Sequence, residues 1–359
     1  MAYFSQKQVD RLKESNIQIL EALARYRYLT SRQIIALGIT AHRSQISRIM
    51  GRFEYFTKPL IERSKFSEAT EGRKGRRAKE DIITLTKRGA EFLIATQPDM
   101  EDDIRFVRSK GIAARDYEHT KETVDFHILV DQFAAMYACT VDCFHTYHDH
   151  TGANNGKDAA QGINLRRRQT TFTVPEVDAD GRTTGKEHKF SADAMFHLTD
   201  PTGKGHLFAV EIQRGQDTKR LCEKLRDHYI PALAEGTISE DYGVQYNPKV
   251  LVICESPALI ENTLKRLADD PEFEFFHKCF AFHTIEELQG TSEDFDIAQE
   301  APKGLAWNLT KDTRQQIAYA LRDRNNWLQI MNDDPKYSEH PKRLAKGWRF
   351  IGGKVRTIF

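Results

Sequence analysis

Residues 30–53, TSRQIIALGITAHRSQISRIMGRF, decide the first part of the fold. Thr30 predicts a helix N-cap, because its hydroxyl can accept a hydrogen bond from a backbone N–H of the first turn, and Gly38 predicts where that helix ends. Thr40 predicts the cap of a second helix, expected over residues 41–55. Two helices joined by a tight turn are typical of the helix-turn-helix layout.

The flanking residues extend this pattern on both sides. Apolar residues recur roughly every three or four positions over residues 8–26, which predicts an amphipathic helix before the motif. After the motif, residues 60–63 and 82–85 predict two short strands around a basic tip, and Thr86 predicts the cap of a closing helix. The sequence therefore predicts a winged helix-turn-helix over residues 5–95.

This module carries the residue types that contact DNA. Arg and Gln in the first turns of such a helix can form paired hydrogen bonds with guanine and adenine edges in the major groove. Base contacts are expected from Arg43, Ser44, Gln45 and Arg48. Phosphate contacts are expected from the wing residues Arg73, Lys74, Arg76 and Arg77. A winged helix that docks another protein is the alternative.

The charge of the chain is unevenly distributed. The 359 residues carry a net charge of only +1, but residues 1–90 hold 19 Lys and Arg against nine Asp and Glu. Residues 91–359 hold 34 against 43. Basic side chains near phosphates gain affinity by releasing condensed counterions, so this asymmetry favours a double-stranded DNA partner for the N-terminal part. A solvated basic face is the alternative.

The sequence also bears on the compartment. The five cysteines have neither zinc-knuckle spacing nor the density of a disulfide scaffold, which predicts reduced thiols. No apolar run of about 18 residues predicts a membrane span, and the first 20 residues are too polar for a signal peptide. A cytoplasmic protein is expected.

The rest of the chain has an α/β (α+β) pattern. We expect a winged helix domain over residues 1–97, a linker over 98–115, a mixed-sheet core over 116–290, and a helical and basic extension over 291–359. The core is expected to begin with a long helix. Strands are then predicted at residues 165–174, 188–198, 207–213, 250–254 and 280–283, with helices at 217–234 and 257–268.

Two carboxylates are placed where folding alone would not put them. Asp193 is expected within the strand of residues 188–198, and Glu211 follows a run of apolar residues directly. The turn at residues 200–203 predicts a hairpin that brings the two side chains together. Neighbouring carboxylates repel unless a cation neutralises them, so Mg²⁺ or Mn²⁺ held by Asp193 and Glu211 is one interpretation. In the other, Glu211 simply pairs with Arg214 or Lys224.

Three short motifs resemble a known family. They are Ser191-Ala-Asp-Ala194, Glu211-Ile-Gln-Arg-Gly215 and Glu223-Lys-Leu-x-x-x-Tyr229. The chain resembles the replication-relaxation family of plasmid and mobile-element proteins, and the MobC class of mobilization relaxases is similar in layout. The resemblance implies a winged helix followed by a restriction-endonuclease-like core of the PD-(D/E)xK type. It also places His127 and Asp131 on the first helix of that core.

One departure from the family pattern bears on catalysis. Gln213 occupies the position of the lysine that would orient or deprotonate water, and Gln can only form hydrogen bonds. Lys224 could compensate from the following helix, so the catalytic set implied by the resemblance is Asp193, Glu211, Gln213 and Lys224. Tyr229 lies on a helix face with leucines, and packing is its expected role.

Other basic and metal-ligating groups are secondary candidates. His145, His148 and His150 have spacing that could hold zinc, although a solvated loop is the favoured interpretation. Residues 166–168 could contact phosphates. The tail at residues 336–359 mixes basic and aromatic side chains, as single-stranded DNA binders do.

Two functions remain open from the sequence. One is a metal-dependent nicking endonuclease or relaxase in plasmid mobilization and conjugation, acting at an origin of transfer or replication with accessory mobilization proteins. The other is a non-enzymatic regulator of plasmid replication or transcription that keeps only DNA binding. Gln213 favours the regulator, whereas the retained Asp193 and Glu211 favour the nuclease.

Overall fold

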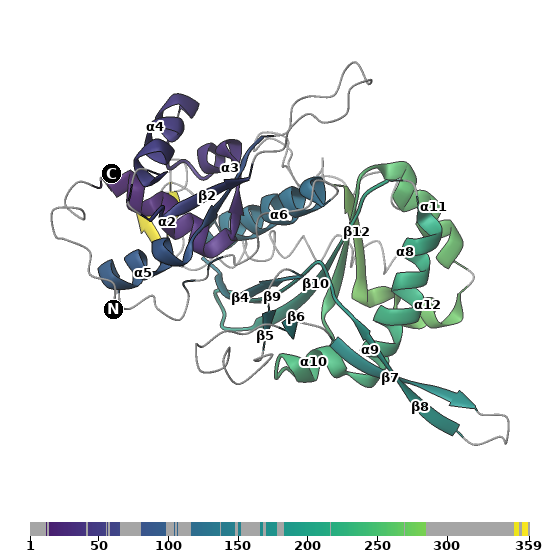
Figure 1. The fold of residues 1–359 in the computed structure, drawn as a ribbon. Helices are drawn as coiled ribbons and strands as arrows, with labels where there is room; N and C mark the ends of the chain where they lie inside the picture. The colour runs from purple at the N-terminus through teal and green to yellow at the C-terminus, as the bar shows by residue number, and fades with distance from the viewer. Residues whose placement is uncertain are drawn as a thin grey trace, which may run out of the picture. The chain divides into compact units, whose positions relative to one another are not determined.

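The computed structural model describes residues 12, 14–40, 42–54, 56, 58–64, 80–97, 104, 106, 116–136, 138–147, 150–151, 166–167, 170–177, 183–215, 217–268, 270–284, 348–351 and 354–357. These residues form a mixed α/β protein whose largest sheet is a mixed sheet of five strands (Figure 1). The expected wing residues Arg73, Lys74, Arg76 and Arg77 lie outside the described residues, as do His148, Arg168, residues 98–103 and residues 285–347.

The chain divides into two compact units. The first combines residues 1–135 with 341–359, and the second spans residues 136–340. The first unit contains α2 (Glu14–Tyr26), β1 (Tyr28–Leu29), α3 (Ser31–Ala36), α4 (Arg43–Glu54), β2 (Ile61–Ser64), β3 (Ile82–Leu85), α5 (Lys87–Thr96) and nearly all of α6 (Tyr117–Met136). It also contains the hairpin of β13 (Trp348–Ile351) and β14 (Lys354–Thr357).

The helix start at Thr30 is confirmed. The Thr30 hydroxyl accepts a hydrogen bond from the Gln33 N–H, and the Gln33 side chain accepts one from the Thr30 N–H, so the two residues form a capping box. Gly38 follows α3 with a φ of 68°, in the left-handed region that glycine adopts without strain. Here the sequence located both ends of the helix.

The next helix begins later than expected. α4 starts at Arg43 rather than at residue 41, and its first carbonyl acceptor is that of His42, which bonds the Ile46 N–H. The Thr40 hydroxyl accepts from the His42 N–H and donates to the Gln45 side chain, so it holds the entry to the helix rather than capping its first turn. The buried face of α4 consists of Ile46, Ile49, Met50 and Phe53.

A small antiparallel sheet completes this part of the first unit. Its order is β1-β3-β2, and the expected pair of strands, β2 and β3, is confirmed. The sequence analysis missed β1, which is only two residues long and follows α2 directly. Thr86 caps α5 as expected, because its hydroxyl accepts from the Gly89 N–H.

α6 packs with the helices of the first unit. Val124 and Ile128 belong to the same apolar cluster as Leu23 and Phe53. Polar contacts join α6 to two earlier helices: Asp131 accepts hydrogen bonds from Arg25, and Asp125 accepts one from Gln33. The structure thus groups most of residues 116–136 with the first unit, whereas the sequence analysis assigned them to the second domain.

The second unit is a five-stranded sheet with helices. Its elements are β4 (Thr140–Thr146), β5 (His150–Thr151), β6 (Arg166–Arg167), β7 (Thr170–Val177), β8 (Thr183–Phe190), β9 (Ala194–Thr199), β10 (Gly205–Gln213), α8 (Thr218–Lys224), η2 (Leu225–Tyr229), α9 (Ile230–Glu235), α10 (Thr237–Asp241), β11 (Lys249–Cys254), α11 (Pro257–Leu267), α12 (Pro271–Phe276), η3 (His277–Cys279) and β12 (Phe280–Thr284). The sheet order is β12-β11-β10-β9-β4.

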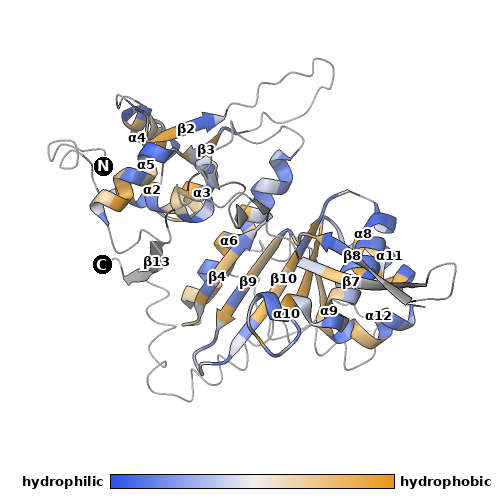
Figure 2. Ribbon diagram, turned by 60° about the horizontal axis from the view of Figure 1, so that its bottom comes forward, coloured by the Kyte–Doolittle hydropathy of each residue, from blue (hydrophilic) through white to orange (hydrophobic). Residues whose placement is uncertain are grey.

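The sheet is antiparallel on one side of β10 and parallel on the other. β9 pairs antiparallel with β10 and β4, while β11 pairs parallel with β10 and β12. A parallel pair needs a crossover connection, and the helices α8 to α10 supply the one between β10 and β11. Hydrophobic residues concentrate in β9 and β10, whereas α8 and α11 carry many hydrophilic ones (Figure 2).

The expected single strand at residues 188–198 is wrong. The segment divides into β8, which pairs with β7 in a separate hairpin, and β9, which joins the main sheet. Residues 191–193 lie between the two strands. The Asp193 N–H donates to the Val210 carbonyl, and the Asp193 carbonyl accepts from the Tyr147 N–H. Asp193 therefore precedes β9 rather than lying within a strand.

The helix after β10 is also interrupted. α8 passes into a π-helical segment, η2, in which the Ile230 N–H donates to the Leu225 carbonyl five residues earlier. Pro231 follows at once, and proline can neither donate to the carbonyl four residues back nor avoid crowding it. The predicted helix at residues 217–234 is thus interrupted by a wider turn just before Pro231. Leu221, Leu225, Tyr229 and Leu233 form a buried stripe along it.

Among the described residues, none of the helices is long and apolar enough to cross a membrane.

Candidate functional site

Asp193 is fixed at the start of β9 by the strand beside it. The hairpin register pairs Ala194 with Val210, so Asp193 lies level with Glu211. Its Oδ2 accepts a hydrogen bond of 2.6 Å from the Ile212 N–H. The turn predicted at residues 200–203 is confirmed: Asp200 accepts from the backbone N–H groups of Thr202 and Lys204. The turn sets the register that brings the two carboxylates to one place.

Glu211 is buried in β10 and bonded through both of its oxygens. Nζ of Lys224 donates to Oε1 at 2.6 Å, and the hydroxyl of Tyr229 donates to Oε2 at 3.1 Å. Only 4% of Glu211 is exposed. A buried carboxylate is stable in a protein when such partners compensate for lost hydration.

The electrostatics of the three groups are coupled. Burial and the charge of Asp193 raise the pKa of Glu211 to about 7, against the lowering effects of Lys224 and Tyr229. Burial alone would lower the pKa of Lys224, but the charges of Glu211 and Asp193 outweigh it and raise that pKa. Two carboxylates thus interact with one ammonium group, and burial is the largest cause of the raised pKa of Glu211.

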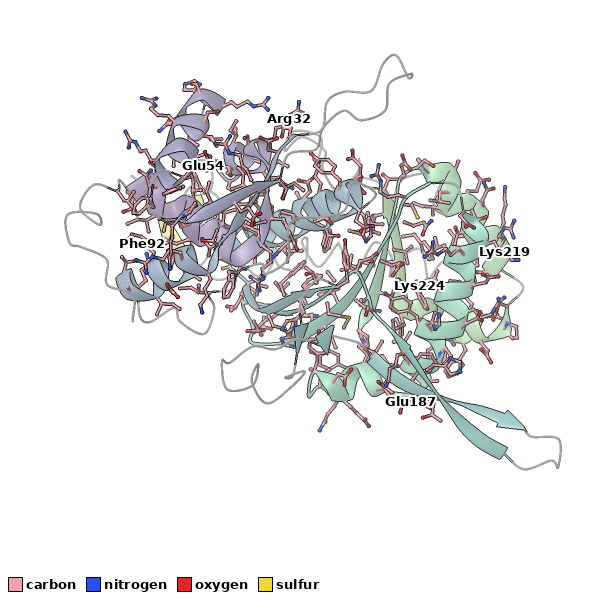
Figure 3. The ribbon with its side chains drawn as sticks, viewed as in Figure 1. Arg32, Glu54, Phe92, Glu187, Lys219 and Lys224 are labelled. Carbon is pink, nitrogen blue, oxygen red and sulfur yellow. The ribbon has the colours of Figure 1, made fainter. Side chains whose placement is uncertain are left out.

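Lys224 comes from α8, on the side that faces the sheet. Figure 3 shows its side chain directed toward the strands, whereas Lys219 of the same helix points away from them. The Lys219 side chain is 75% exposed and pairs with Glu223, while that of Lys224 is 26% exposed. The structure therefore joins Asp193, Glu211 and Lys224, three of the four residues singled out from the sequence.

Tyr229 belongs to this cluster as well, although the sequence analysis gave it a packing role only. It is fully buried, and burial and the charge of Glu211 raise its pKa well above the usual value. Because it remains a protonated phenol, it can only donate to Glu211. The two residues are 18 positions apart, and this spacing alone does not predict the bond. Tyr229 ends the π-helical segment η2, which a regular helical period does not predict.

Gln213 is not part of the cluster. Its Nε2 donates to the carbonyl of Arg214 at 3.0 Å, and it pairs with Cys254 across the parallel strands. Nearby, Glu255 accepts a hydrogen bond from the Gly215 N–H, so the loop after β10 is fixed by a carboxylate that the sequence analysis did not single out. The amide of Gln213 thus supports this loop.

A small hollow of about 20 Å³, with room for about one water molecule, opens beside the chain neighbours of Asp193. Its lining comprises His145, Thr146, Thr170, Ser191, Ala192, Met195 and Tyr242. Nδ1 of His145 lies 3.2 Å from the Tyr242 hydroxyl. Four of the seven lining side chains carry a hydroxyl group, so the hollow is polar.

The structure bears on the metal candidates only in part. Within the described ranges, no three His, Cys, Asp or Glu side chains gather into a group that could hold a metal ion. The carboxylates of Asp193 and Glu211 form a pair rather than such a group. His145 lies in β4, bonded as described, and His150 in β5.

The residues expected to contact bases lie on the outer face of α4. Arg43, Ser44 and Arg48 are exposed, while Gln45 is half-buried and bonded to Thr40. The arrangement leaves the polar side of α4 open along its first turns. His127 and Asp131, which the resemblance placed with the core, lie in the first unit beside Arg25 and Tyr26.

Comparison of the chain with protein-family models, curated proteins and solved structures gives no match.

Proposed function

We propose that the protein is a DNA-binding, metal-dependent endonuclease that nicks DNA at an origin of transfer or replication, as a relaxase of a plasmid or mobile element would. The observation that carries this proposal is the cluster of Asp193, Glu211 and Lys224 at one end of the β9–β10 hairpin. Phosphodiester cleavage needs negative charge to be stabilised on the scissile phosphate, and paired carboxylates next to a lysine are suited to hold the cations that do so.

The arrangement of the elements supports the fold that this function implies. β1, α3 and α4, followed by β2 and β3 in a sheet of order β1-β3-β2, are the elements that a winged helix-turn-helix module would have. In the second unit, an antiparallel hairpin continues into parallel strands joined by helices, which is compatible with a restriction-endonuclease-like core. We interpret the first unit as the DNA reader and the second as the nuclease.

The residues present fit a divalent cation. Mg²⁺ is usually bound through one or two carboxylates together with water and substrate phosphate, and Asp193 and Glu211 would supply two. The pairing of Asp193 with Glu211 across the β9–β10 hairpin is the observation that favours this fit. A bound Mg²⁺ or Mn²⁺ would polarise water and neutralise the phosphate.

The chain's own groups have distinct tasks in this proposal. The Ile212 N–H donates to Oδ2 of Asp193, and this hydrogen bond fixes the orientation of the whole carboxylate. Tyr229 keeps one oxygen of Glu211 in place from the buried side. Lys224 neutralises Glu211 until substrate arrives, and its ammonium group can then donate to a phosphate oxygen.

A second function is favoured by Gln213. Its amide bonds the Arg214 carbonyl, so this position supplies no group to activate water, and Lys224 is already paired with Glu211. A fold with these features could bind DNA without cleaving it, which describes a non-enzymatic regulator of plasmid replication or transcription. The two proposals share DNA binding and differ only in cleavage.

One experiment separates them. The full chain is incubated with supercoiled plasmid carrying the origin of its own element, with Mg²⁺, Mn²⁺ or EDTA, with and without accessory mobilization proteins. Relaxation on a gel that requires the metal and is lost in Glu211→Gln supports the endonuclease. A retarded plasmid that stays supercoiled under every condition supports the regulator. No binding to any duplex would refute both.

A further inference from the structure

Glu80 joins the two helices of the helix-turn-helix segment. Its Oε1 lies 3.2 Å from Nε of Arg32 at the start of α3 and 3.5 Å from a terminal nitrogen of Arg43 at the start of α4. The Glu80 side chain is 12% exposed, whereas those of Arg32 and Arg43 are 68% and 65% exposed. A shielded carboxylate therefore lies behind two exposed guanidinium groups.

The backbone of Glu80 is fixed from the interior. Its N–H donates to the hydroxyl of Tyr117 at 3.1 Å, and Tyr117 is a buried member of the apolar cluster of the first unit. β3 begins two residues later at Ile82 and is bonded on both sides. The carboxylate is thus positioned by α6 and by the sheet, and it does not depend on Arg32 or Arg43 for its place.

This carboxylate distinguishes between the two kinds of DNA contact. A guanidinium group has five N–H donors, so Arg43 can keep its ion pair with Glu80 and still donate to the edge of a base. A phosphate is different, because its charge is repelled by the carboxylate and competes with it for the same arginines. Glu80 therefore weakens phosphate contacts more than base contacts.

We propose that Glu80 is the residue that sets the selectivity of the DNA reader: it holds Arg43 in the orientation that meets a base edge and opposes non-specific binding of the phosphate backbone by Arg32 and Arg43. This inference rests on the proposed DNA binding and goes beyond it, since a module that only needed affinity would leave both arginines unpaired. A carboxylate so close to an interface lowers affinity and raises discrimination.

The test compares Glu80→Gln with a matched control. Glu91→Gln removes the same charge from the first unit, but Glu91 pairs with Arg88 on α5 rather than with α3 or α4. Binding of each full-length protein to a 30-base-pair duplex of arbitrary sequence is measured by fluorescence anisotropy over a series of salt concentrations. Glu80→Gln should bind about three- to tenfold more tightly, with a salt slope steeper by about one to two units, since each phosphate contact contributes about 0.9.

The second measurement uses the tightest duplex that the wild-type protein selects from a randomised library. For Glu80→Gln, the affinity for the selected duplex divided by the affinity for the arbitrary duplex should fall. The reason is that the substitution should increase the affinity for the arbitrary duplex only. Glu80→Asp keeps the charge on a shorter side chain, so its non-specific affinity should stay near wild type while the ratio falls. Melting curves establish that each variant is folded; if Glu80→Gln is not, Glu80→Asp carries the test alone.

The outcomes separate the inference from the proposed function. A wild-type protein that binds no duplex even at low salt overturns both. If the wild type binds DNA but Glu80→Gln and Glu91→Gln have the same affinity and salt slope, the inference is overturned and the proposed function stands. The same holds if Glu80→Asp leaves the affinity ratio unchanged.

Discussion

The ammonium group of Lys224 lies 2.6 Å from Oε1 of Glu211, although the two residues are 13 positions apart on a helix and a strand. This pair forms because α8 follows β10 after a short loop and packs on the face of the sheet that carries Glu211. In the proposed nuclease, the lysine beside the carboxylates would thus be supplied by the helix rather than by position 213.

Replacement of Lys224 by Met should remove nicking activity, because Glu211 would lose its cationic partner and the substrate phosphate a donor. Breaking a buried pair typically costs about 3–5 kcal/mol, but Glu211 can take up a proton, so the loss of stability should be nearer the lower end. The measurements are plasmid relaxation and urea unfolding. Lys219→Met on the exposed side of α8 is the control, and equal activity of the two variants would return Lys224 to a structural role.

Asp193→Asn and Glu211→Gln should each abolish metal-dependent nicking while leaving the affinity for duplex DNA within about twofold of wild type. Both substitutions keep the size of the side chain and remove the charge that a divalent cation requires. Gel retardation measures the DNA affinity and plasmid relaxation measures the nicking activity of the same preparations. Joint loss of binding and nicking would instead indicate that the carboxylates act through folding.

The structural origin of this site shows what the sequence could and could not predict. The hairpin was predictable, because a turn at Asp200 between two apolar runs fixes the register. The alternating pattern does not encode the division at residues 191–193, where backbone bonds of Asp193 with Val210 and Tyr147 replace strand pairing. The contact of Tyr229 was equally hidden, since it requires the π turn before Pro231.

The first unit gives a similar lesson for long-range contacts. Capping at Thr30 and Thr86 is local, so residue types three positions apart were enough to predict it. The attachment of α6 depends on residues about 100 positions apart, such as Arg25 and Asp131, and a single sequence holds no signal for that pairing. The arginines of α3 and α4 were visible in the sequence, but the carboxylate behind them was not.

The stability of the protein should depend on pH through Glu211. Its pKa is raised from 4.5 to about 7 in the folded state, so protonation of Glu211 stabilises the fold. This stabilisation is complete below about pH 4.5 and is lost as the pH rises through 7. The melting temperature of Glu211→Gln minus that of the wild type should therefore increase between pH 4.5 and 7 and then level off. A difference independent of pH would contradict the raised pKa.

Divalent cations should reverse this effect if the carboxylate pair binds them. At pH 8, Mg²⁺ or Mn²⁺ at millimolar concentration should raise the melting temperature of the wild type and have little effect on Asp193→Asn or Glu211→Gln. At pH 5.5 the shift of the wild type should shrink, because protons and the cation compete for Glu211. Ca²⁺ and equal ionic strength in NaCl are the controls for non-specific salt effects.

The two sets of predicted DNA contacts should differ in kind. Replacing Arg73, Lys74, Arg76 and Arg77 together by Ala should lower the salt slope of binding by about one unit for each lost phosphate contact, on any duplex. Arg43→Ala or Gln45→Ala should instead cost about 1–3 kcal/mol on a selected duplex and little on an arbitrary one. An unchanged slope would remove the wing from the interface, and equal weakening on both duplexes would count against base contacts from α4.

Asp131→Asn should destabilise the first unit more than any substitution on the exposed face of α4. Asp131 is fully buried and accepts hydrogen bonds from the Arg25 guanidinium and, at 2.6 Å, from the Tyr26 hydroxyl. The substitution keeps the shape of the side chain but leaves the Arg25 cation without its counterion in a buried place, where the pKa of Arg25 is raised by Asp131 against the effect of burial. Losing one partner of a buried pair costs about 3–5 kcal/mol.

The neighbouring His127 makes this substitution informative about charge. Burial and the charges of Arg25 and Arg27 hold the pKa of His127 well below its usual value, so this imidazole stays neutral and adds no second positive charge beside Arg25. Urea unfolding of the full chain at pH 7, followed by far-ultraviolet circular dichroism, should therefore show the loss of about 3 kcal/mol or more for Asp131→Asn. Asp125→Asn, which changes the separate contact of α6 with Gln33 of α3 at a partly exposed side chain, should cost less than about 1 kcal/mol, and equal losses would count against a special role of the buried pair of Arg25 and Asp131.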